Sequence, residues 1–429
     1  MHALLDLVAR HRQGHATGVT SICSAHPLVI EASLRHAQRT GQDLLLFEAT
    51  CNQVNQDGGY TGMRPADFVA FVHGIAQRVG FDTSRIALGG DHLGPNPWTD
   101  LDAGAAMDKA EVMVAAYIAA GFRKIHLDCS MACSGDPEPL PEAEIVRRAV
   151  RLCRAAEAAW AVAGGEAPVY VIGTEVPVPG GATEAIEGLA LTTPDAALAT
   201  IQAHRDAFAG AGLEDAWQRV VASVVQPGVE FDHHDVIDYD SSKAHALSEA
   251  VTTVPGMVFE AHSTDYQTRD ALGALVRDHF AILKVGPGLT FALREALWAL
   301  DAIEREWIAE GQRAGLREVT LQRMQDAPGY WQRYYHGEGR ALATDLQYSL
   351  SDRIRYYWPD ARIEQARAQL FDNLRADPPP LPLIGQYLPH ALHAVRNGTA
   401  SLDPQSLAMA HISAVLDDYH HACQDHDLS

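Results

Sequence analysis

Short apolar runs recur along the first two thirds of the chain, and a longer segment with helical periodicity follows each of them. Their starts lie roughly 20 to 50 residues apart, which is the length of a strand, a helix and two loops. This alternation of strand and helix predicts a parallel sheet. The eight predicted strands are Val19–Ser24, Leu44–Thr50, Ile86–Gly90, Lys124–Cys129, Val169–Thr174, Val220–Gln226, Met257–Ala261 and Phe280–Val285.

The segments between the strands carry apolar residues at helical spacing. In Ala105–Ala120, Met113 and Tyr117 fall on one stripe, and Gly121 follows as a helix C-cap. A second stripe of this kind lies in Gln267–Asp278. Both segments are predicted to be helices that cover the sheet.

A polar residue follows nearly every predicted strand, and this feature separates a closed barrel from its rival, an open doubly wound sheet. In a barrel, the carboxyl ends of all strands meet at one mouth, where barrel enzymes carry out their chemistry. Eight units with polar ends therefore favour the α/β class and a (β/α)₈ TIM barrel, in which these polar residues form one cluster.

Beyond Gly288 the pattern changes to helices alone. A long amphipathic helix is followed by helical and irregular segments that are rich in aromatic residues at Tyr330–Tyr335 and Tyr356–Trp358. We expect a barrel over residues 1–300 and a C-terminal helical region, packed on the barrel, over residues 301–429. The stripe of the long helix is Leu293, Leu297, Leu300, Ile303 and Trp307.

Composition narrows the classes of function. The chain of 429 residues has a formal net charge of −22, which disfavours nucleic acid and anionic membranes as partners because both require a basic surface. No apolar run is long enough to span a membrane, and the first residues lack a signal-peptide core. Six scattered cysteines fit the reduced thiols of a cytoplasmic protein.

Asp91 and His92 follow the third predicted strand and place a carboxylate next to an imidazole. Such a pair can bind a metal or transfer a proton. Neighbouring strand residues point to opposite faces, so both reach the mouth only if the strand has already ended, as the glycines on either side suggest. The alternative is an aspartate that caps a helix beside a surface histidine.

Two more strand ends carry histidine and carboxylate groups. His262 follows the seventh strand, while Glu230, Asp232 and the pair His233 and His234 follow the sixth. Together with His92, such residues suit a divalent cation that keeps an open coordination position. The alternatives are a hydrogen-bonded core histidine at 262 and a solvated loop at 233–234.

Asp128 and Glu175 join Asp91 as candidate acids or bases. Asp128 ends the fourth strand at the same parity as His126, and Glu175 follows the fifth strand. Each carboxylate either transfers protons or orients a metal-bound histidine from behind. The sequence leaves both roles open.

Several polar side chains suit the binding of a sugar. Ser263 and Thr264 continue a polar loop after the seventh strand. Arg353 and Arg355 share strand-like parity beside aromatic residues, so Ser349–Trp358 is predicted to fold back to the mouth and bind a phosphate or carboxylate; a salt-bridged helix on the barrel's side is the alternative. The loop after the second strand offers four amides, each a donor and an acceptor for hydroxyls: Asn52, Gln53, Asn55 and Gln56.

Lys284 lies on the eighth strand, directly before a Gly-Pro-Gly turn. It either pairs with a carboxylate or phosphate, or forms the Schiff base of a metal-free aldolase, or fills the barrel interior. The glycines of the turn are compatible with a phosphate site near the seventh and eighth strands.

The motifs at these strand ends resemble those of the Z-subunit family of class II tagatose-bisphosphate aldolases, from about residue 8 to about residue 425. That family has been described as a non-catalytic subunit needed by a catalytic aldolase, and it has relatives that are metal-dependent 4-epimerases of ketohexoses or ketohexuronates. The motifs are SICSAHPLVIEA (21–32), EATCNQVNQDGGYTGM (48–63), GGDHLGPN (89–96), KIHLDCSM (124–131), IGTEVPVPGG (172–181), VVQPGVEFDH (224–233), EAHSTDYQT (260–268), DHFAILKVGP (278–287) and SLSDRIRYYWP (349–359).

The similarity to catalytic class II aldolases implies a metal centre. It assigns His92, Glu230 and His262 to one divalent cation, with zinc expected first and manganese, cobalt or nickel as alternatives, and it places Asp91 as the acid. The expected substrate is a ketose, a ketose phosphate or a ketouronate, handled by an aldolase or a 4-epimerase. The alternative is a non-catalytic subunit that stabilises an aldolase partner, and a homo-oligomer is compatible with either function. A kinase is not expected, because the sequence has no Walker-type phosphate loop.

Overall fold

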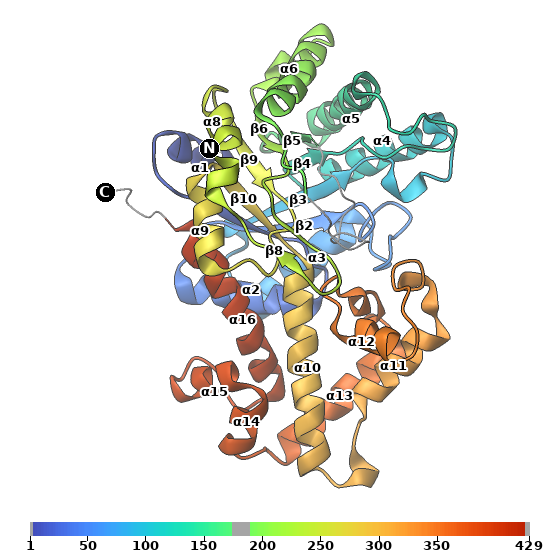
Figure 1. Cartoon of the computed structure of the whole chain (residues 1–429), viewed down its shortest axis with the longest axis vertical. Coiled ribbons are helices and arrows are strands. Elements are labelled where there is room, and N and C mark those ends of the chain that lie inside the picture. The colour runs from blue at the N-terminus through green and yellow to red at the C-terminus, as the bar shows by residue number, and fades with distance from the viewer. Residues whose placement is uncertain (1–2, 174–188, 425–429) are drawn as a thin grey trace.

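Eight parallel strands close into one barrel in a computed structural model that describes residues 3–173 and 189–424. Each strand pairs with its sequence neighbour in the barrel, and the last pairs with the first (Figure 1). The predicted (β/α)₈ barrel is therefore confirmed, and the open sheet is excluded. The barrel strands are β1 (Val19–Ile22), β2 (Leu45–Thr50), β3 (Ile86–Leu93), β4 (Lys124–Leu127), β5 (Val169–Gly173), β6 (Val220–Val224), β9 (Val258–Ala261) and β10 (Phe280–Val285).

Helices cover the outside of the barrel. Helix α4 (Ala103–Ala120) buries Met113 and Tyr117 and ends at Gly121, whose φ of 104° is the left-handed conformation of a C-cap, as predicted. A small antiparallel hairpin, β7 (Glu230–Phe231) with β8 (Val236–Ile237), follows the sixth barrel strand. The other helices of this part are α1 (Ala3–Arg12), α2 (Pro27–Thr40), α3 (Pro65–Val79), α5 (Glu142–Ala163), α6 (Pro194–Gly210), α7 (Glu214–Trp217), α8 (Ser241–Thr252) and α9 (Arg269–Arg277).

The C-terminal helices form a second mass beside the barrel (Figure 1). Helix α10 (Pro287–Trp307) leads away from the barrel, and α16 (Pro404–Cys423) returns to pack against α2, α9 and α10. The Gly18 N–H donates to the Cys423 carbonyl at 3.1 Å, so the last helix contacts the start of the first strand. Between them lie α11 (Leu316–Asp326), α12 (Arg340–Tyr348), the 3₁₀ helix η5 (Arg353–Tyr357), α13 (Ala361–Ala376), α14 (Leu381–Tyr387) and α15 (Pro389–Arg396).

The third strand departs from its prediction. It continues through Asp91 and His92 to Leu93, so the expectation that it ends at Gly90 is wrong. Its register with β4 shifts between Gly90 and Leu93, and His92 adopts a left-handed φ of 48°. This irregularity breaks the strict alternation of faces, and as a result Asp91 and His92 both line the cavity at the mouth.

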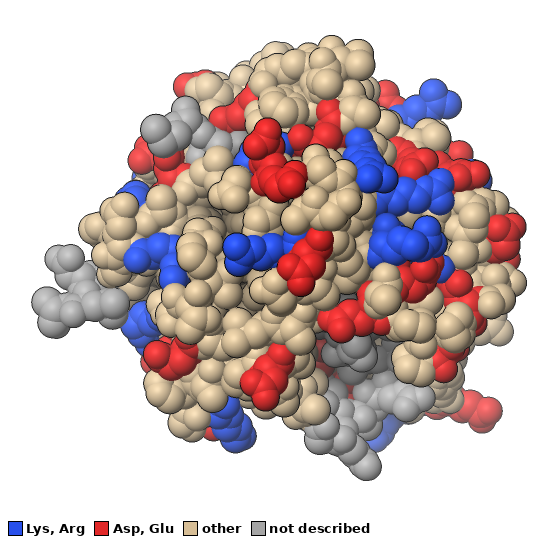
Figure 2. Space-filling model, turned by 90° about the horizontal axis from the view of Figure 1, so that it is seen from above, with Lys and Arg blue, Asp and Glu red and all other residues tan. Residues whose placement is uncertain are grey.

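Charged side chains of both signs lie on the face seen from above. Several Lys and Arg side chains lie side by side at the right of this face, with Asp and Glu side chains around them (Figure 2). None of the described helices is long and apolar enough to cross a membrane.

Helix α2 begins at a histidine that acts as its N-cap. The His26 side chain accepts a hydrogen bond from the Leu28 N–H at 3.2 Å, which requires an unprotonated ring nitrogen. Burial, reinforced by the charge of Arg367, lowers the pKa of His26 to about 3. In the unfolded chain this histidine binds a proton near pH 6.5, so its contribution to stability is complete above that pH and is lost as the pH falls towards 3.

We therefore expect acidification from pH 7 to pH 5 to destabilise the fold by about 2 kcal/mol through His26 alone. The variant His26→Asn keeps a capping acceptor but does not titrate, so it should lose less stability over this interval. Urea unfolding of both proteins at pH 7 and pH 5 measures the difference. Equal losses in the two proteins would show that the cap is insensitive to pH.

Candidate metal centre

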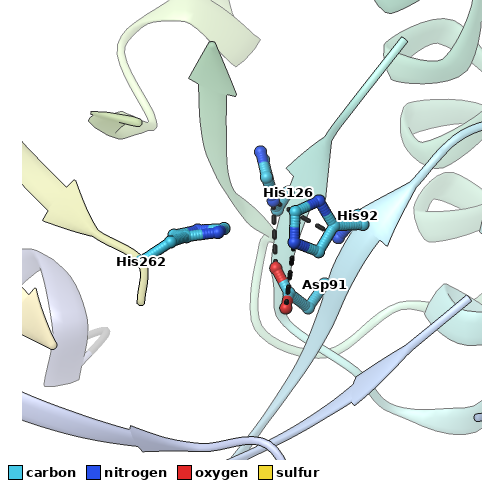
Figure 3. Close-up of side chains that lie close together, drawn as sticks. All are labelled: Asp91, His92, His126 and His262. Atoms are coloured by element: carbon cyan, nitrogen blue, oxygen red, sulfur yellow. Dashed lines mark hydrogen bonds and ion pairs between the residues drawn. The ribbon is translucent and has the colours of Figure 1, made fainter. Parts of the chain in front are cut away.

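Three histidines and one aspartate converge at the mouth of the barrel (Figure 3). Asp91 and His92 come from β3, His126 from β4 and His262 from the residue after β9. One potential ligand atom of each lies within 4.8 Å of those of the other three, and all four side chains are buried. The rings of His92 and His262, the two predicted histidine ligands, have their centroids 4.9 Å apart.

A carboxylate fixes the ring of His92 from behind. His92 Nδ1 lies 2.7 Å from Asp128 Oδ2, while Asp128 Oδ1 accepts hydrogen bonds from the N–H and hydroxyl of Ser130. Burial acts to raise the pKa of Asp128, but the hydrogen bond and charge of His92 outweigh it and hold that pKa well below its ordinary value. The ionised carboxylate thus accepts a hydrogen bond from the Nδ1–H of His92 and directs Nε2 of that ring toward Asp91, which is the usual arrangement behind a metal-bound histidine.

This geometry supports an orienting role for Asp128 rather than proton transfer to a substrate. We expect Asp128→Asn to weaken binding of a divalent cation by about 10- to 100-fold, because the ring of His92 loses its ionised partner. Titration against a chromophoric chelator measures the change. The control is Asp57→Asn, since Asp57 is half-exposed and pairs with Lys109 at the surface. If Asp128→Asn and the wild type bind the cation with equal affinity, Asp128 has no role in the metal site.

Hydrogen bonds also orient the other two histidines of the group. His126 Nε2 lies 3.0 Å from the Gly173 carbonyl and donates to it, which leaves the lone pair on Nδ1. That nitrogen faces Asp91 Oδ1 at 3.0 Å, and two acceptor atoms this close need a proton or a cation beside them. His262 Nε2 donates to Glu260 at 3.0 Å, and burial lowers the pKa of His262 to about 4.

A buried ionic network lies beside the histidines. Lys124 Nζ lies 2.6 Å from Glu48 and 2.7 Å from Glu260, and Lys284 Nζ lies 2.5 Å from Glu48 and 2.9 Å from Asp91. With Asp128, this cluster holds four carboxylates against two ammonium groups, all at most 5% exposed. Burial acts to lower the pKa of His92, but Asp91 and Asp128 outweigh it and raise that pKa, so the surplus carboxylates favour a positive charge among the imidazoles, from a proton or a bound cation.

The ammonium group of Lys284 forms ion pairs with the carboxylates of this network. Burial alone would lower its pKa, but Asp91 and the neighbouring acidic groups raise the pKa of Lys284 well above its ordinary value. A Schiff base requires a neutral amine, so the geometry speaks against the metal-free aldolase that the sequence left open.

The mouth contains a cavity of ≈ 110 Å³ between the barrel and the C-terminal region. Arg355 and Tyr356 of η5 line it together with Asp91 and His92, which confirms that Ser349–Trp358 folds back to the mouth. Four other residues predicted to bind substrate also line this cavity: Asn52, Gln53, Ser263 and Lys284.

A sequence profile of the D-tagatose-1,6-bisphosphate aldolase subunit GatZ/KbaZ-like family matches residues 4–424. The chain belongs to this family. Among solved structures, a probable tagatose 6 phosphate kinase from Sinorhizobium meliloti 1021 is 50% identical, with a TM-score of 0.88 over 95% of this chain and 100% of that chain. The fructuronate-tagaturonate epimerase UxaE from Cohnella laeviribosi is 13% identical, with a TM-score of 0.51 over 95% and 82%, and so shares the fold alone.

The remaining side chains predicted to bind substrate in this GatZ/KbaZ-like chain do not line the cavity. The Asn55 amide bonds to the backbone of its own loop, and Gln56 donates to the Lys109 carbonyl at 3.0 Å. Thr264 is buried and donates to the Lys284 carbonyl. Arg353 donates to the Tyr330 carbonyl and stacks on Tyr334, turned away from the mouth. In a 3₁₀ helix, residues two apart point in different directions, so the strand-like parity predicted for the two arginines does not hold.

Two other predicted residues lie outside the group of four. Glu230, on the β7 hairpin, accepts a hydrogen bond from the Phe231 N–H at 3.0 Å and is not among the converging side chains. Glu175 falls outside the described residues. The group instead includes His126, to which the sequence assigned no role. Its signal was the alternation of polar residues at Lys124 and His126 in β4 and at Asp128 just after it, which places three polar side chains on one face.

Proposed function

We propose that this family member is a metal-dependent enzyme that breaks and re-forms a carbon–carbon bond of a ketohexose or its phosphate. The observation that carries the proposal is the convergence of three imidazoles and Asp91 at the mouth, beside a buried network in which carboxylates outnumber ammonium groups. A non-catalytic scaffold has no need for such a cluster, because buried charge without compensation destabilises a fold.

The donor set fits a divalent cation. His92, His126 and His262 offer imidazole nitrogens, which suit zinc first, with manganese, cobalt or nickel as alternatives. His126 takes the third position in this proposal, and Glu230 is the rival that family similarity suggested. When bound, the cation would polarise the ketose carbonyl and stabilise the negative charge that bond cleavage develops there.

Asp91 is proposed as the group that moves the proton. Burial would raise its pKa, but His92 and Lys284 outweigh burial and hold the pKa of Asp91 well below its ordinary value, so it is ionised and able to accept a proton. Lys284 positions the carboxylate at 2.9 Å. In a retro-aldol step Asp91 takes the proton from the hydroxyl beside the breaking bond, and it returns that proton when the bond re-forms.

The C-terminal segment at the mouth favours 4-epimerisation above release of two products. Arg355 and Tyr356 line the same cavity as Asp91 and His92. Side chains on both sides of a bound sugar would retain the two fragments after cleavage, so the aldehyde can rotate and present its other face to re-addition. Net aldol cleavage of the same substrate is the second candidate.

Metal analysis and a substrate panel test the proposal. The purified protein should contain close to one divalent cation per chain, and it should interconvert tagatose and fructose, or their 6-phosphates, as followed by ¹³C NMR. Release of free triose products would identify an aldolase instead. A metal-free protein that converts none of these sugars, yet raises the activity of a catalytic tagatose-bisphosphate aldolase, would establish the subunit function.

A further inference from the structure

A second cavity, of ≈ 280 Å³, adjoins the mouth. Its walls come from the loop after β1, the loop after β2, the start of α10 and the segment from η5 to α13. It therefore lies between the barrel and the C-terminal region, and we call it the seam cavity. None of the four converging groups of the metal centre lines it, so a molecule in the seam cavity does not occupy the place of the proposed reaction.

The walls of the seam cavity are mainly apolar. Two charged side chains lie among them, and these have opposite signs, Arg355 and Glu364. Neither sign of charge prevails, and such walls suit an uncharged ligand with an apolar body. The apolar wall residues are Ala25, Pro27, Met63, Trp358 and Pro359.

Several polar groups of the walls are engaged within the protein. The Thr61 hydroxyl donates to the Gln53 carbonyl at 2.7 Å, and the Gln53 amide donates to the Cys23 carbonyl at 3.4 Å. The Thr290 hydroxyl donates to Asp352. A sugar in this cavity would find few partners for its many hydroxyls, and unpaired hydroxyls are costly to bury.

Two N–H donors of the walls lack acceptors. Trp358 is 2% exposed, and its indole N–H has no acceptor within the described residues. His26 accepts the Leu28 N–H through Nδ1, so its own proton is on Nε2, and no hydrogen bond of that proton occurs in the same part of the chain. The two rings contact each other edge to face, with centroids 6.4 Å apart. Because a buried donor without an acceptor is costly, the pair marks a place for an acceptor atom of a ligand.

Both donors are uncharged. Burial lowers the pKa of His26 to about 3, so its imidazole is neutral at pH 7, and an indole does not ionise. Two neutral N–H groups suit a neutral oxygen such as a carbonyl, since an anion would require a charged donor for its strongest contacts. A cavity of about 150 Å³ can hold benzene, so the seam cavity has room for one ring with a short substituent.

We propose that the seam cavity is a second binding site, which takes an uncharged small molecule with an apolar body and a carbonyl-type oxygen held by Trp358 and His26. Its ligand would contact the wall of the mouth without reaching the converging histidines. The wall residues common to the two cavities are Cys23, Gln53, Tyr60 and Arg355.

Calorimetric titration of the full-length protein with two probes tests the site. Acetophenone carries a carbonyl on a ring, and ethylbenzene has a similar shape without an acceptor. Trp358→Phe removes the N–H and keeps an aromatic ring. We expect it to lower the affinity for acetophenone about fivefold and to leave that for ethylbenzene within about twofold of the wild type.

The matched control is Trp298→Phe. Trp298 is a buried neighbour of Trp358 whose indole N–H also lacks an acceptor within the described residues, but it does not line the seam cavity. This variant should change neither affinity by more than about twofold. Ala25→Leu supplies an independent check, because the larger side chain fills part of the cavity and should abolish binding of both probes. Removal of metal with a chelator should leave both affinities unchanged.

The absence of saturable acetophenone binding would overturn the inference. Equal losses for the two probes in Trp358→Phe would also overturn it, because the indole N–H would then have no part in recognition. Acetophenone binding that persists in Ala25→Leu, or that requires the metal, would place the probe elsewhere and have the same consequence. If Trp358→Phe weakens binding of tagatose and not of acetophenone, the seam cavity belongs to the sugar site instead.

Discussion

Replacing His262 with alanine is expected to abolish retention of the divalent cation and to reduce turnover by about a thousandfold or more, which corresponds to ~4 kcal/mol of transition-state stabilisation. The imidazole is one of four converging groups and is held neutral by burial. His92→Ala should have the same effect, since it removes the ring that Asp128 orients. Metal content after gel filtration and initial rates measure both losses.

The matched control is His390→Ala, because His390 lies exposed on α15, away from the barrel mouth. It should retain metal and activity. His126 and Glu230 are the two candidates for the third ligand. We expect His126→Ala to lose more metal than Glu230→Gln. Full activity in both His92→Ala and His262→Ala, or an active wild type without metal, would reduce the cluster to a structural element.

Replacing Lys124 with methionine should destabilise the fold by about 3–5 kcal/mol. The two side chains have similar length, so the change removes the charge with little change in volume. Lys124 is inaccessible to water and lies within 2.7 Å of both Glu48 and Glu260, so its loss leaves two buried carboxylates without their shared partner. Chemical denaturation of the metal-free protein measures the effect without the contribution of a bound cation.

An exposed ion pair provides the comparison for Lys124. Lys109 contacts Asp57 at 2.9 Å, but both side chains are substantially exposed, so Lys109→Met should cost less than about 1 kcal/mol. If the Lys124 variant is no less stable than the Lys109 variant, the carboxylates of the network are protonated or hydrated in the native protein, and the charge argument for a cation fails.

The sequence predicted the barrel well because each strand is marked by local signals. An apolar run, a polar end and a following helical stripe all lie within a few dozen residues, and the closure of the sheet follows from their repetition. The convergence of His92 and His262 was predictable for the same reason, since strand ends meet wherever a barrel closes.

The details that were not predicted depend on contacts between distant segments. The two glycines before Asp91 suggested the end of a strand, but a Cβ on Gly89 would lie 2.8 Å from the Glu48 side chain, so this glycine makes room for a buried carboxylate of the neighbouring strand. Arg353 and Arg355 were equivalent in sequence. The 3₁₀ helix at the mouth makes them different: Arg355 points to the cavity, and Arg353 stacks on Tyr334.

The return of α16 to the start of the first strand sets a condition on how the molecule folds. The hydrogen bond between Gly18 and Cys423 joins residues far apart in the sequence, so it forms only after the segment through Cys423 has left the ribosome. Contacts of such long sequence separation slow folding, because the entropy of closing the loop is lost before the contact stabilises anything. Until α16 packs against β1, the barrel lacks this contact. We expect its dependence on chaperones to be greatest before α16 has folded.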